Sequence, residues 1–220
     1  MIPTMRNEVL IQAKSFSDFE VPDFPRIRKV LHLLKNRNPG LCVDLGYCRG
    51  SFADYLLAQG WRCIGIDIVR RITYETGIYT IQSDLFGDFP ILDNSVDLIT
   101  AGELIEHMTD ETIFLQECWR VLKPGGWLAL TTPNMSFLLN RVLVPLGKMP
   151  MFVYAPYHYR IFNLAALRRV LQESGFNIKH TTSSHILYST RKHPSGKVFE
   201  ALGDLYPTFG AHLIVIVEKN

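Results

Sequence analysis

The sequence predicts an α/β protein in which a mostly parallel β-sheet is covered by helices on both faces. Strand-like apolar runs alternate with helical or turn-rich segments, which is the order that builds such a sheet. These runs are residues 41–45, 62–67, 78–82, 96–100 and 126–131. The first run leads into a glycine turn and then an amphipathic segment, which is how a site for a nucleotide-type ligand opens in these folds. An enzyme is therefore the leading hypothesis.

Length and composition favour one domain over residues 1–220. Of the 220 residues 47% are hydrophobic, enough to bury a full core. The 23 Lys and Arg against 21 Asp and Glu leave a net charge of +2, which is too weak to predict nucleic-acid binding. The N-terminus lacks an apolar signal core, and no run of about 18 apolar residues occurs. We expect a soluble, cytoplasmic protein with no integral membrane association.

The cysteines indicate neither a metal site nor a disulfide framework. The chain has four, at positions 42, 48, 63 and 118, without a Cys-x-x-Cys pair, and two of them fall inside strand-like runs. Reduced thiols and no bound metal are expected.

Residues 1–37 are predicted to form an N-terminal lead-in followed by a helix. The first 24 residues show no clear period and contain Pro3 and Pro22. Residues 26–37 then place apolar side chains on one helical face, and the Asn-Pro-Gly sequence at 38–40 ends this helix before the first strand.

Two further helices lie between the strands. One spans residues 51–59, directly after the glycine turn. The other spans residues 110–122 and ends at the Lys-Pro-Gly-Gly sequence of 123–126, which also begins the fifth strand.

The C-terminal part is predicted to add one helix and two strands. The helix begins at Asn163 as its N-cap and ends at Ser174, before a glycine. The strands are residues 176–182 and 211–218.

The segment 135–162 is predicted to be an apolar insertion between the fifth strand and the next helix. Its side chains are apolar on several helical faces, more than one core-facing stripe requires. A lid over an apolar ligand would explain this composition. A helix buried on two sides or a homodimer interface would also explain it.

Acidic and glycine residues fall at four successive strand ends. They are the Asp-Leu-Gly sequence at 44–46, Asp67, Asp84, and the Ala-Gly-Glu sequence at 101–103. In an open α/β sheet the carboxyl ends of the strands form the ligand crevice. Carboxylates at that edge suit ribose hydroxyls and an amino group.

This combination resembles the class I S-adenosylmethionine-dependent methyltransferases over residues 38–220, in particular the small-molecule, type 11/12-like group. Three further sequences support the resemblance: Glu-Leu-Ile-Glu-His at 103–107, Leu-Lys-Pro-Gly-Gly-Trp at 122–127 and Thr-Pro-Asn at 132–134. The segment 157–163, followed by a helix, is also similar to the end of those enzymes.

The resemblance implies a Rossmann-like three-layer sandwich with a seven-stranded sheet. Its strand order would be 3-2-1-4-5-7-6, with the last strand antiparallel. The implied cofactor is S-adenosylmethionine, which leaves as S-adenosylhomocysteine. The glycine loop would lie against its methionine part, Asp67 would hold the ribose and Asp84 the adenine amine. The candidate cofactor-binding residues are Asp44, Gly46, Tyr47, Cys48, Gly50, Asp67, Ile68, Asp84, Leu85, Gly102 and Glu103.

The expected chemistry is in-line methyl transfer to O, N or C of a small molecule, with a weak preference for an apolar one. A sulfonium methyl group is already activated, so the protein chiefly aligns the acceptor. If the acceptor is a hydroxyl, His107 is the candidate general base, and its alternative role is capping or packing at a helix start. The candidate acceptor-binding residues are Asn134, Tyr154, Tyr157 and His158.

Several of these residues also have a structural interpretation. Asp44 could cap the turn that follows it, and Asp84 could serve an ordinary turn. Asp97 could simply start the fourth strand, and it is left outside the catalytic set. Cys48 stands where a third glycine would strengthen the loop, and we interpret it as a small hydrophobic residue.

Three other functions compete with that of a small-molecule methyltransferase. A nicotinamide dehydrogenase needs Gly-x-Gly-x-x-Gly, which residues 46–51 do not supply. A methyltransferase acting on nucleic acid would be expected to have a basic stripe, and this sequence shows none. A catalytically weak or inactive methyltransferase-like partner subunit stays open, because of the departure at Cys48.

Overall fold

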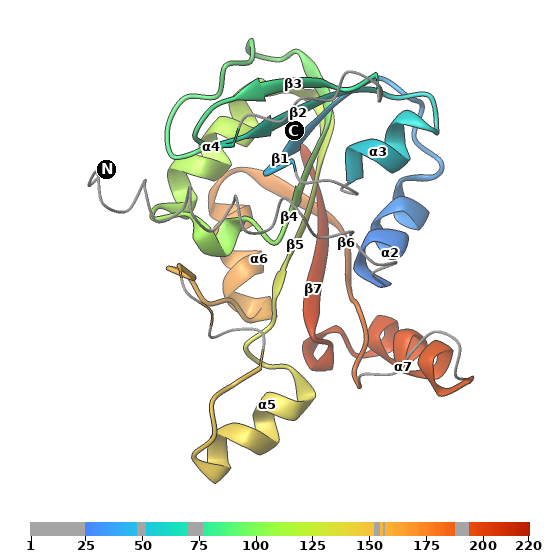
Figure 1. Cartoon of the computed structure of the whole chain (residues 1–220), viewed down its shortest axis with the longest axis vertical. Coiled ribbons are helices and arrows are strands. Elements are labelled where there is room, and N and C mark those ends of the chain that lie inside the picture. The colour runs from blue at the N-terminus through green and yellow to red at the C-terminus, as the bar shows by residue number, and fades with distance from the viewer. Residues whose placement is uncertain (1–24, 48–51, 70–76, 152–154, 156, 188–193) are drawn as a thin grey trace.

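The molecule is built around one seven-stranded sheet (Figure 1), and the computed structural model describes residues 25–47, 52–69, 77–151, 155, 157–187 and 194–220. The strand order is β3-β2-β1-β4-β5-β7-β6, as expected from the resemblance. Strands β1 to β5 pair in parallel, and β7 is antiparallel to both of its neighbours. The strands are β1 (Leu41–Leu45), β2 (Arg62–Asp67), β3 (Tyr79–Gln82), β4 (Val96–Gly102), β5 (Leu122–Pro133), β6 (Phe176–Ser183) and β7 (His212–Lys219).

Helices cover both faces of the sheet and complete three layers. The helices are α2 (Pro25–Leu34), α3 (Phe52–Leu57), α4 (Glu111–Val121), α5 (Leu138–Leu143), α6 (Leu164–Glu173) and α7 (Pro194–Leu205), with short 3₁₀ turns η1 (Ile105–His107), η2 (Val144–Leu146) and η3 (Pro207–Phe209). One buried apolar cluster joins α4 and α6 to the sheet, and a second joins α2 and α3 to the opposite face. Figure 1 shows these two pairs of helices on opposite sides of the strands.

The central strands are apolar because both of their faces are buried. Residues 213–217 of β7 are fully buried, and so is most of β1. A strand covered on both faces shows a continuous apolar run rather than an alternating one. For this reason the predicted bounds of the first two strands, 41–45 and 62–67, agree with those observed.

Side chains cap two helix starts, of which the one at Asn163 was predicted. The Asp110 carboxylate accepts hydrogen bonds from the backbone N–H groups of Thr112 (2.9 Å) and Ile113 (3.2 Å) at the start of α4. The Asn163 side chain accepts one from the N–H of Ala166 (2.9 Å) at the start of α6. Each cap satisfies amides that the first helical turn leaves without an internal partner.

Strand β5 begins at Leu122, four residues earlier than predicted. The sequence at 123–126, which was predicted to be a turn, belongs to the strand because Lys123 is bonded to Asp97 of β4. The Lys123 ammonium donates to Asp97 Oδ1 (2.7 Å), and the backbone N–H of Leu41 donates to Asp97 Oδ2 (2.8 Å). A β-bulge between Val96 and Leu98 accommodates the change of register. Asp97 therefore ties together the starting ends of β1, β4 and β5, at the opposite edge from the candidate site.

Helix α7 was not expected from the sequence. Residues 194–205 form it beside the end of β6, and no helix had been predicted between 183 and 210. The first predicted helix, in contrast, is present but ends at Leu34 rather than at residue 37.

Part of the 135–162 segment projects from the body of the protein. Figure 1 shows α5 extending beyond the end of the sheet. Phe137 is fully buried at its base, whereas Val142, Leu146 and Met149 are 55%, 66% and 60% exposed. Within this chain α5 is thus not buried on two sides, and a lid or an interface between copies stays a prediction.

Three cysteines, Cys42, Cys63 and Cys118, are buried free thiols. Cys48 lies outside the described residues. In the described part of the chain, none of the helices combines the length and apolarity needed to cross a bilayer.

Replacement of Gly65 by alanine is expected to destabilise the fold. A Cβ atom at this position would lie 2.5 Å from Cγ of the buried Tyr47 ring, which has no room to move. Overpacking of this kind typically lowers the free energy of unfolding by about 1–3 kcal/mol. Urea denaturation would measure it. The control is Gly87→Ala, where a Cβ meets no atom within 4 Å, and equal stability of the two variants would contradict the prediction.

Candidate functional site

The carboxyl ends of the parallel strands bring the predicted cofactor residues to one edge of the sheet. In the sheet register Leu45 lies opposite Ile66 and Ala101, and Gly102 lies opposite Thr131. Asp67 ends β2 opposite Gln82 of β3. The residues that follow these positions, Gly46, Ile68, Asp84 and Glu103 among them, therefore share this edge.

The loop after β1 bends back across the end of β2. The backbone N–H groups of Gly46 and Tyr47 both donate to the carbonyl of Ile66, at 2.8 and 3.1 Å. Gly46 has φ +69°, a conformation that suits glycine, and a Cβ there would lie 3.1 Å from the Leu104 side chain. Cys48 and Gly50, the next predicted cofactor residues, lie outside the described residues.

Asp44 connects three elements beneath this loop. Its carboxylate is 2% exposed and accepts hydrogen bonds from the Thr100 hydroxyl of β4 (2.7 Å) and from the N–H of Ala53 in α3 (3.0 Å). This is close to the capping role weighed from the sequence. Through these bonds Asp44 fixes where α3 begins relative to β1, and so it positions both ends of the glycine loop.

Tyr47 directs its ring into the core. The side chain is 1% exposed, packs against Gly65, and its hydroxyl donates to Asp54 (3.3 Å). A cofactor contact by Tyr47 would therefore come from its backbone.

The end of β2 forms a tight turn around the Asp67 carboxylate. Asp67 is 8% exposed, and its Oδ1 accepts a hydrogen bond from the N–H of Val69 (2.7 Å). The carbonyl of Ile68 accepts one from the Gln82 side chain (3.1 Å), which links this turn to β3. Asp84 follows β3, and Leu85 beside it is buried in the core.

Glu103 has an uncommon backbone conformation at the end of β4. Its φ is +52°, which is unfavourable for a residue with a side chain and is often found at functional sites. The Glu103 carboxylate accepts a hydrogen bond from Thr131 (2.8 Å) and lies 3.6 Å from both Arg26 of α2 and His212 of β7. Gly102 before it has no room for a side chain, because a Cβ would lie 2.8 Å from the Phe52 ring.

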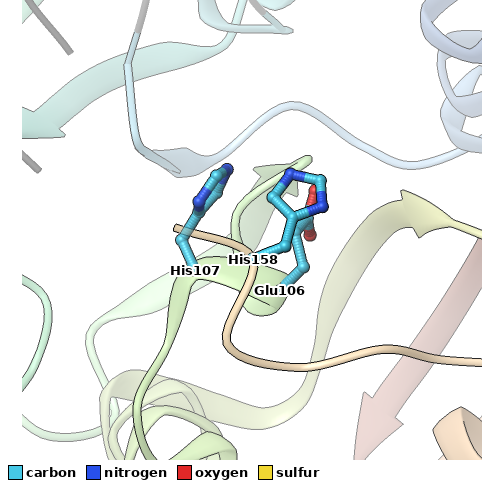
Figure 2. A group of neighbouring side chains, drawn as sticks. All are labelled: Glu106, His107 and His158. Carbon is cyan, nitrogen blue, oxygen red and sulfur yellow. The ribbon is translucent and has the colours of Figure 1, made fainter. Parts of the chain in front are cut away.

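A group formed by Glu106, His107 and His158 lies beyond this strand end (Figure 2). Glu106 and His107 belong to η1, and His158 comes from the segment that precedes α6. One potential ligand atom from each side chain lies within 4.8 Å of the other two. The two imidazole rings are 4.7 Å apart between centroids and meet edge to face.

Backbone hydrogen bonds hold the segment of His158 against η1. The Glu106 carbonyl accepts bonds from the N–H groups of Tyr159 (2.8 Å) and Arg160 (3.1 Å). His107 Nδ1 lies 3.0 Å from the carbonyl oxygen of Tyr157. A carbonyl oxygen can only accept, so Nδ1 carries the proton and His107 Nε2 has a lone pair for a proton or a ligand.

Burial sets the protonation of this group. It lowers the pKa of His107, with a contribution from the neighbouring His158, and favours a neutral imidazole. Burial also raises the pKa of Glu106 well above its usual value, and the charge of Glu103 acts in the same direction.

The other predicted acceptor residues differ in position. The Asn134 side chain is fully buried; its amide donates to the carbonyls of Thr208 (3.1 Å) and Gly210 (2.8 Å), and its oxygen accepts from the N–H of Ser136 (2.9 Å). A substrate contact would have to replace one of these bonds. Tyr157 has φ +69° and contributes its carbonyl to His107, while Tyr154 lies outside the described residues.

Glu106 is the functional candidate that the sequence interpretation missed. It lies inside the Glu-Leu-Ile-Glu-His sequence, which had been noted only as a family feature. A carboxylate directly before a candidate catalytic histidine, at the end of a strand, was the available signal.

Comparison with known proteins identifies the family of the chain. A family model described as a methyltransferase domain matches residues 22–181. The chain belongs to the S-adenosylmethionine-dependent methyltransferases. The family prediction and its cofactor, S-adenosylmethionine, are thereby confirmed, and the nicotinamide dehydrogenase alternative is set aside.

Two relatives illustrate the range of the family. The chain is 31% identical over 163 residues to a Mycolicibacterium smegmatis protein described as a probable S-adenosylmethionine-dependent methyltransferase, covering 72% of this chain and 60% of that protein. It is 24% identical over 165 residues to a ubiquinone biosynthesis O-methyltransferase of Leptothrix cholodnii, covering 69% and 70%. The chain thus spans less than two thirds of the length of the first relative.

The fold also matches solved methyltransferases. The Burkholderia thailandensis 1,6-didemethyltoxoflavin-N1-methyltransferase, solved with bound 1,6-didemethyltoxoflavin and S-adenosylhomocysteine, aligns with a TM-score of 0.66 and 15% identity. The alignment covers 98% of this chain and 87% of that one. At this identity the likeness concerns the fold alone.

Two further histidines of the methyltransferase, His212 and His185, lie near Glu103. His212 contacts Glu103 and lies 6.1 Å from His185 between ring centroids. Burial lowers the pKa of His212. Burial, together with His212 and Lys29, lowers the pKa of His185 from 6.5 to about 4.

The low pKa of His185 predicts a loss of stability in mild acid. The His185 imidazole binds a proton near pH 6.5 in the unfolded chain and only near pH 4 in the folded chain. The contribution of the neutral imidazole to the free energy of unfolding is therefore complete above pH 6.5 and is lost as the pH falls toward 4. His185→Gln, which removes the titration, should gain stability relative to the parent protein across that interval. Urea denaturation at several pH values measures this difference, with His32→Gln on the exposed face of α2 as the control. A difference that stays constant from pH 7 to about pH 4 would contradict the assignment.

Proposed function

We propose that the protein binds S-adenosylmethionine at the carboxyl edge of its sheet and transfers the methyl group to a small-molecule acceptor. The observation that carries this proposal is the convergence of the β1, β2, β3 and β4 ends at one edge, with the Glu106, His107 and His158 group beside it. An open α/β sheet binds its ligand at such an edge.

In this proposal each strand end has a separate role toward the cofactor. The Gly46 loop lies against the methionine part, Asp67 accepts hydrogen bonds from the ribose hydroxyls, and Asp84 accepts one from the adenine amine. The geometry supports these roles, because the amides of the loop donate hydrogen bonds to the carbonyl of Ile66, the residue directly before Asp67. Leu104 packs over Gly46 and leads directly into η1, so the reacting methyl group would emerge toward His107.

The names of the relatives support a small organic acceptor. One relative is a ubiquinone biosynthesis O-methyltransferase, and one structural neighbour holds 1,6-didemethyltoxoflavin. The exposed apolar side chains of α5 and the turn after it would suit an acceptor with apolar parts. A hydroxyl is the favoured acceptor group, since His107 offers a lone pair at its Nε2.

The reaction would consist of one displacement. As the acceptor hydroxyl loses its proton, its oxygen attacks the sulfonium methyl group from the side opposite the sulfur. The C–O bond forms, the C–S bond breaks, and the electron pair of that bond stays on sulfur, which gives S-adenosylhomocysteine. The protein contributes alignment and exclusion of water, together with an activating group at His107.

Substitution of Asp67 tests the cofactor site. Asp67→Asn replaces a charged acceptor of two hydroxyl hydrogen bonds, and loss of such bonds should weaken S-adenosylhomocysteine binding roughly tenfold to a hundredfold. Isothermal titration calorimetry measures the affinity. The matched control is Asp97→Asn, an aspartate of the same sheet at the opposite edge, which should bind with unchanged affinity.

Two results would count against the proposal. If Asp67→Asn binds S-adenosylhomocysteine as tightly as the parent protein, Asp67 does not hold the ribose. If the parent protein binds neither S-adenosylmethionine nor S-adenosylhomocysteine, the alternative of a methyltransferase-like partner subunit is favoured.

A further inference from the structure

Three side chains with metal-ligand chemistry meet where the acceptor would bind. We propose that Glu106, His107 and His158 form a binding site for a divalent transition-metal ion that holds the acceptor hydroxyl. The acceptor part of this inference rests on the proposed function, whereas ion binding does not. The sequence had predicted no metal site, because the cysteines lack the usual spacing, but this group uses no cysteine.

The spacing of the three side chains fits one ion. Their potential ligand atoms lie within 4.8 Å of one another. Ligand nitrogen and oxygen atoms about 2.1 Å from a common ion are separated by roughly 3–3.5 Å. Small side-chain rotations, about an ångström at the ligand atoms, would therefore close the group around an ion. Figure 2 shows the two imidazoles side by side with the Glu106 carboxylate behind His158.

His107 already has the tautomer that a metal ligand needs. Its Nδ1–H donates to the Tyr157 carbonyl, which leaves the Nε2 lone pair directed away from that bond. Metal-bound histidines almost always donate their other ring N–H to a backbone carbonyl or a carboxylate, which fixes the ring orientation. Tyr157, which accepts this bond beside His158, has a positive φ of 69°.

Glu106 supplies an independent indication of a missing ligand. The residue is 2% exposed, and its Oε2 accepts a hydrogen bond from Thr132 (2.9 Å). Its other oxygen, Oε1, is buried and makes no hydrogen bond within the described part of the chain. A buried carboxylate oxygen without a partner is costly, and a bound cation would satisfy it.

The bonds that hold the group leave Glu106 Oε1 and His107 Nε2 available as ligand atoms. The Tyr159 and Arg160 amides donate to the Glu106 backbone carbonyl, and Thr132 holds only one carboxylate oxygen. These bonds join η1, β5 and the segment before α6 into one support. A metal site built on such a support needs little reorganisation when the ion binds.

The ligand types indicate which ions would bind. Two imidazoles and one carboxylate suit Zn²⁺, Mn²⁺, Fe²⁺ or Co²⁺, whereas Mg²⁺ and Ca²⁺ prefer oxygen ligands alone. Three protein ligands leave at least one coordination position open. A hydroxyl bound there would lose its proton to water near neutral pH, and the resulting oxygen anion would attack the methyl group as described above. In this arrangement the ion, rather than His107 as a free base, activates the acceptor.

Metal titration of untagged, chelator-treated protein tests the inference. Calorimetry with Zn²⁺ should show one site per chain, and Co²⁺ should give visible absorption bands from nitrogen and oxygen ligands. His158→Ala and Glu106→Gln should each weaken Zn²⁺ binding by at least tenfold. His32→Ala, which removes an exposed histidine of α2, should bind Zn²⁺ like the parent protein. Mg²⁺ should bind more weakly than Zn²⁺.

The outcomes separate the ion site from the cofactor site. S-adenosylhomocysteine affinity should be the same in His158→Ala and the parent protein, which also shows that the variant is folded. If His158→Ala does not fold, His158→Gln takes its place. Equal Zn²⁺ affinity in the parent protein and the His158 variant would overturn the inference. Selective Zn²⁺ binding by a parent protein that does not bind S-adenosylhomocysteine would uphold the ion site and refute the proposed function.

Discussion

The buried carboxylate of Asp44 is the constraint on which the arrangement of the site depends. A carboxylate that is 2% exposed is stable only when its oxygens are hydrogen-bonded, and both oxygens are used, by the Thr100 hydroxyl and the Ala53 amide. One donor lies in the neighbouring strand and the other at the start of α3. Because neither bond can be lost without leaving a buried polar group unsatisfied, the glycine loop between them has fixed end points. The strand ends beside it can then face a ligand as a set.

Charge is distributed unevenly around that edge. Glu103 lies between Arg26, His212 and Thr131, and these three partners hold it on the side of α2 and β7. Glu106, three residues later, receives one hydroxyl hydrogen bond, and its Oε1 has no hydrogen-bond partner within the described residues. Two carboxylates that are close in sequence therefore have opposite environments. Such a separation is common where one group has a structural role and the other takes part in binding or chemistry.

The elements that could be predicted are those whose burial or capping is visible directly in the sequence. Strands β1 and β2 are continuous apolar runs because both faces are covered, and α4 and α6 begin at side chains that cap them. Helix α7 was missed although its segment is amphipathic and begins at Pro194, because Gly196 and Gly203 are poor helix formers inside it. The contacts of Glu103 could not be predicted, since Arg26 and His212 come from the first described helix and the last strand. Glu106 with His158 is a similar case, because only the fold brings those two segments together.

The segment that contains α5 is tied to the body of the protein near both of its ends. Asn134 bridges to Phe162 at the end of β5, the Met135 amide donates to the Phe162 carbonyl (2.8 Å), and Tyr159 and Arg160 are tied to η1. The chain between these anchors can change in length and composition while both of its ends stay in register with the sheet. The sheet is thus constrained by hydrogen bonds along every strand, whereas the projecting segment is constrained mainly near its ends. A substitution or insertion in the exposed part of this segment would therefore leave the hydrogen bonds of the sheet intact.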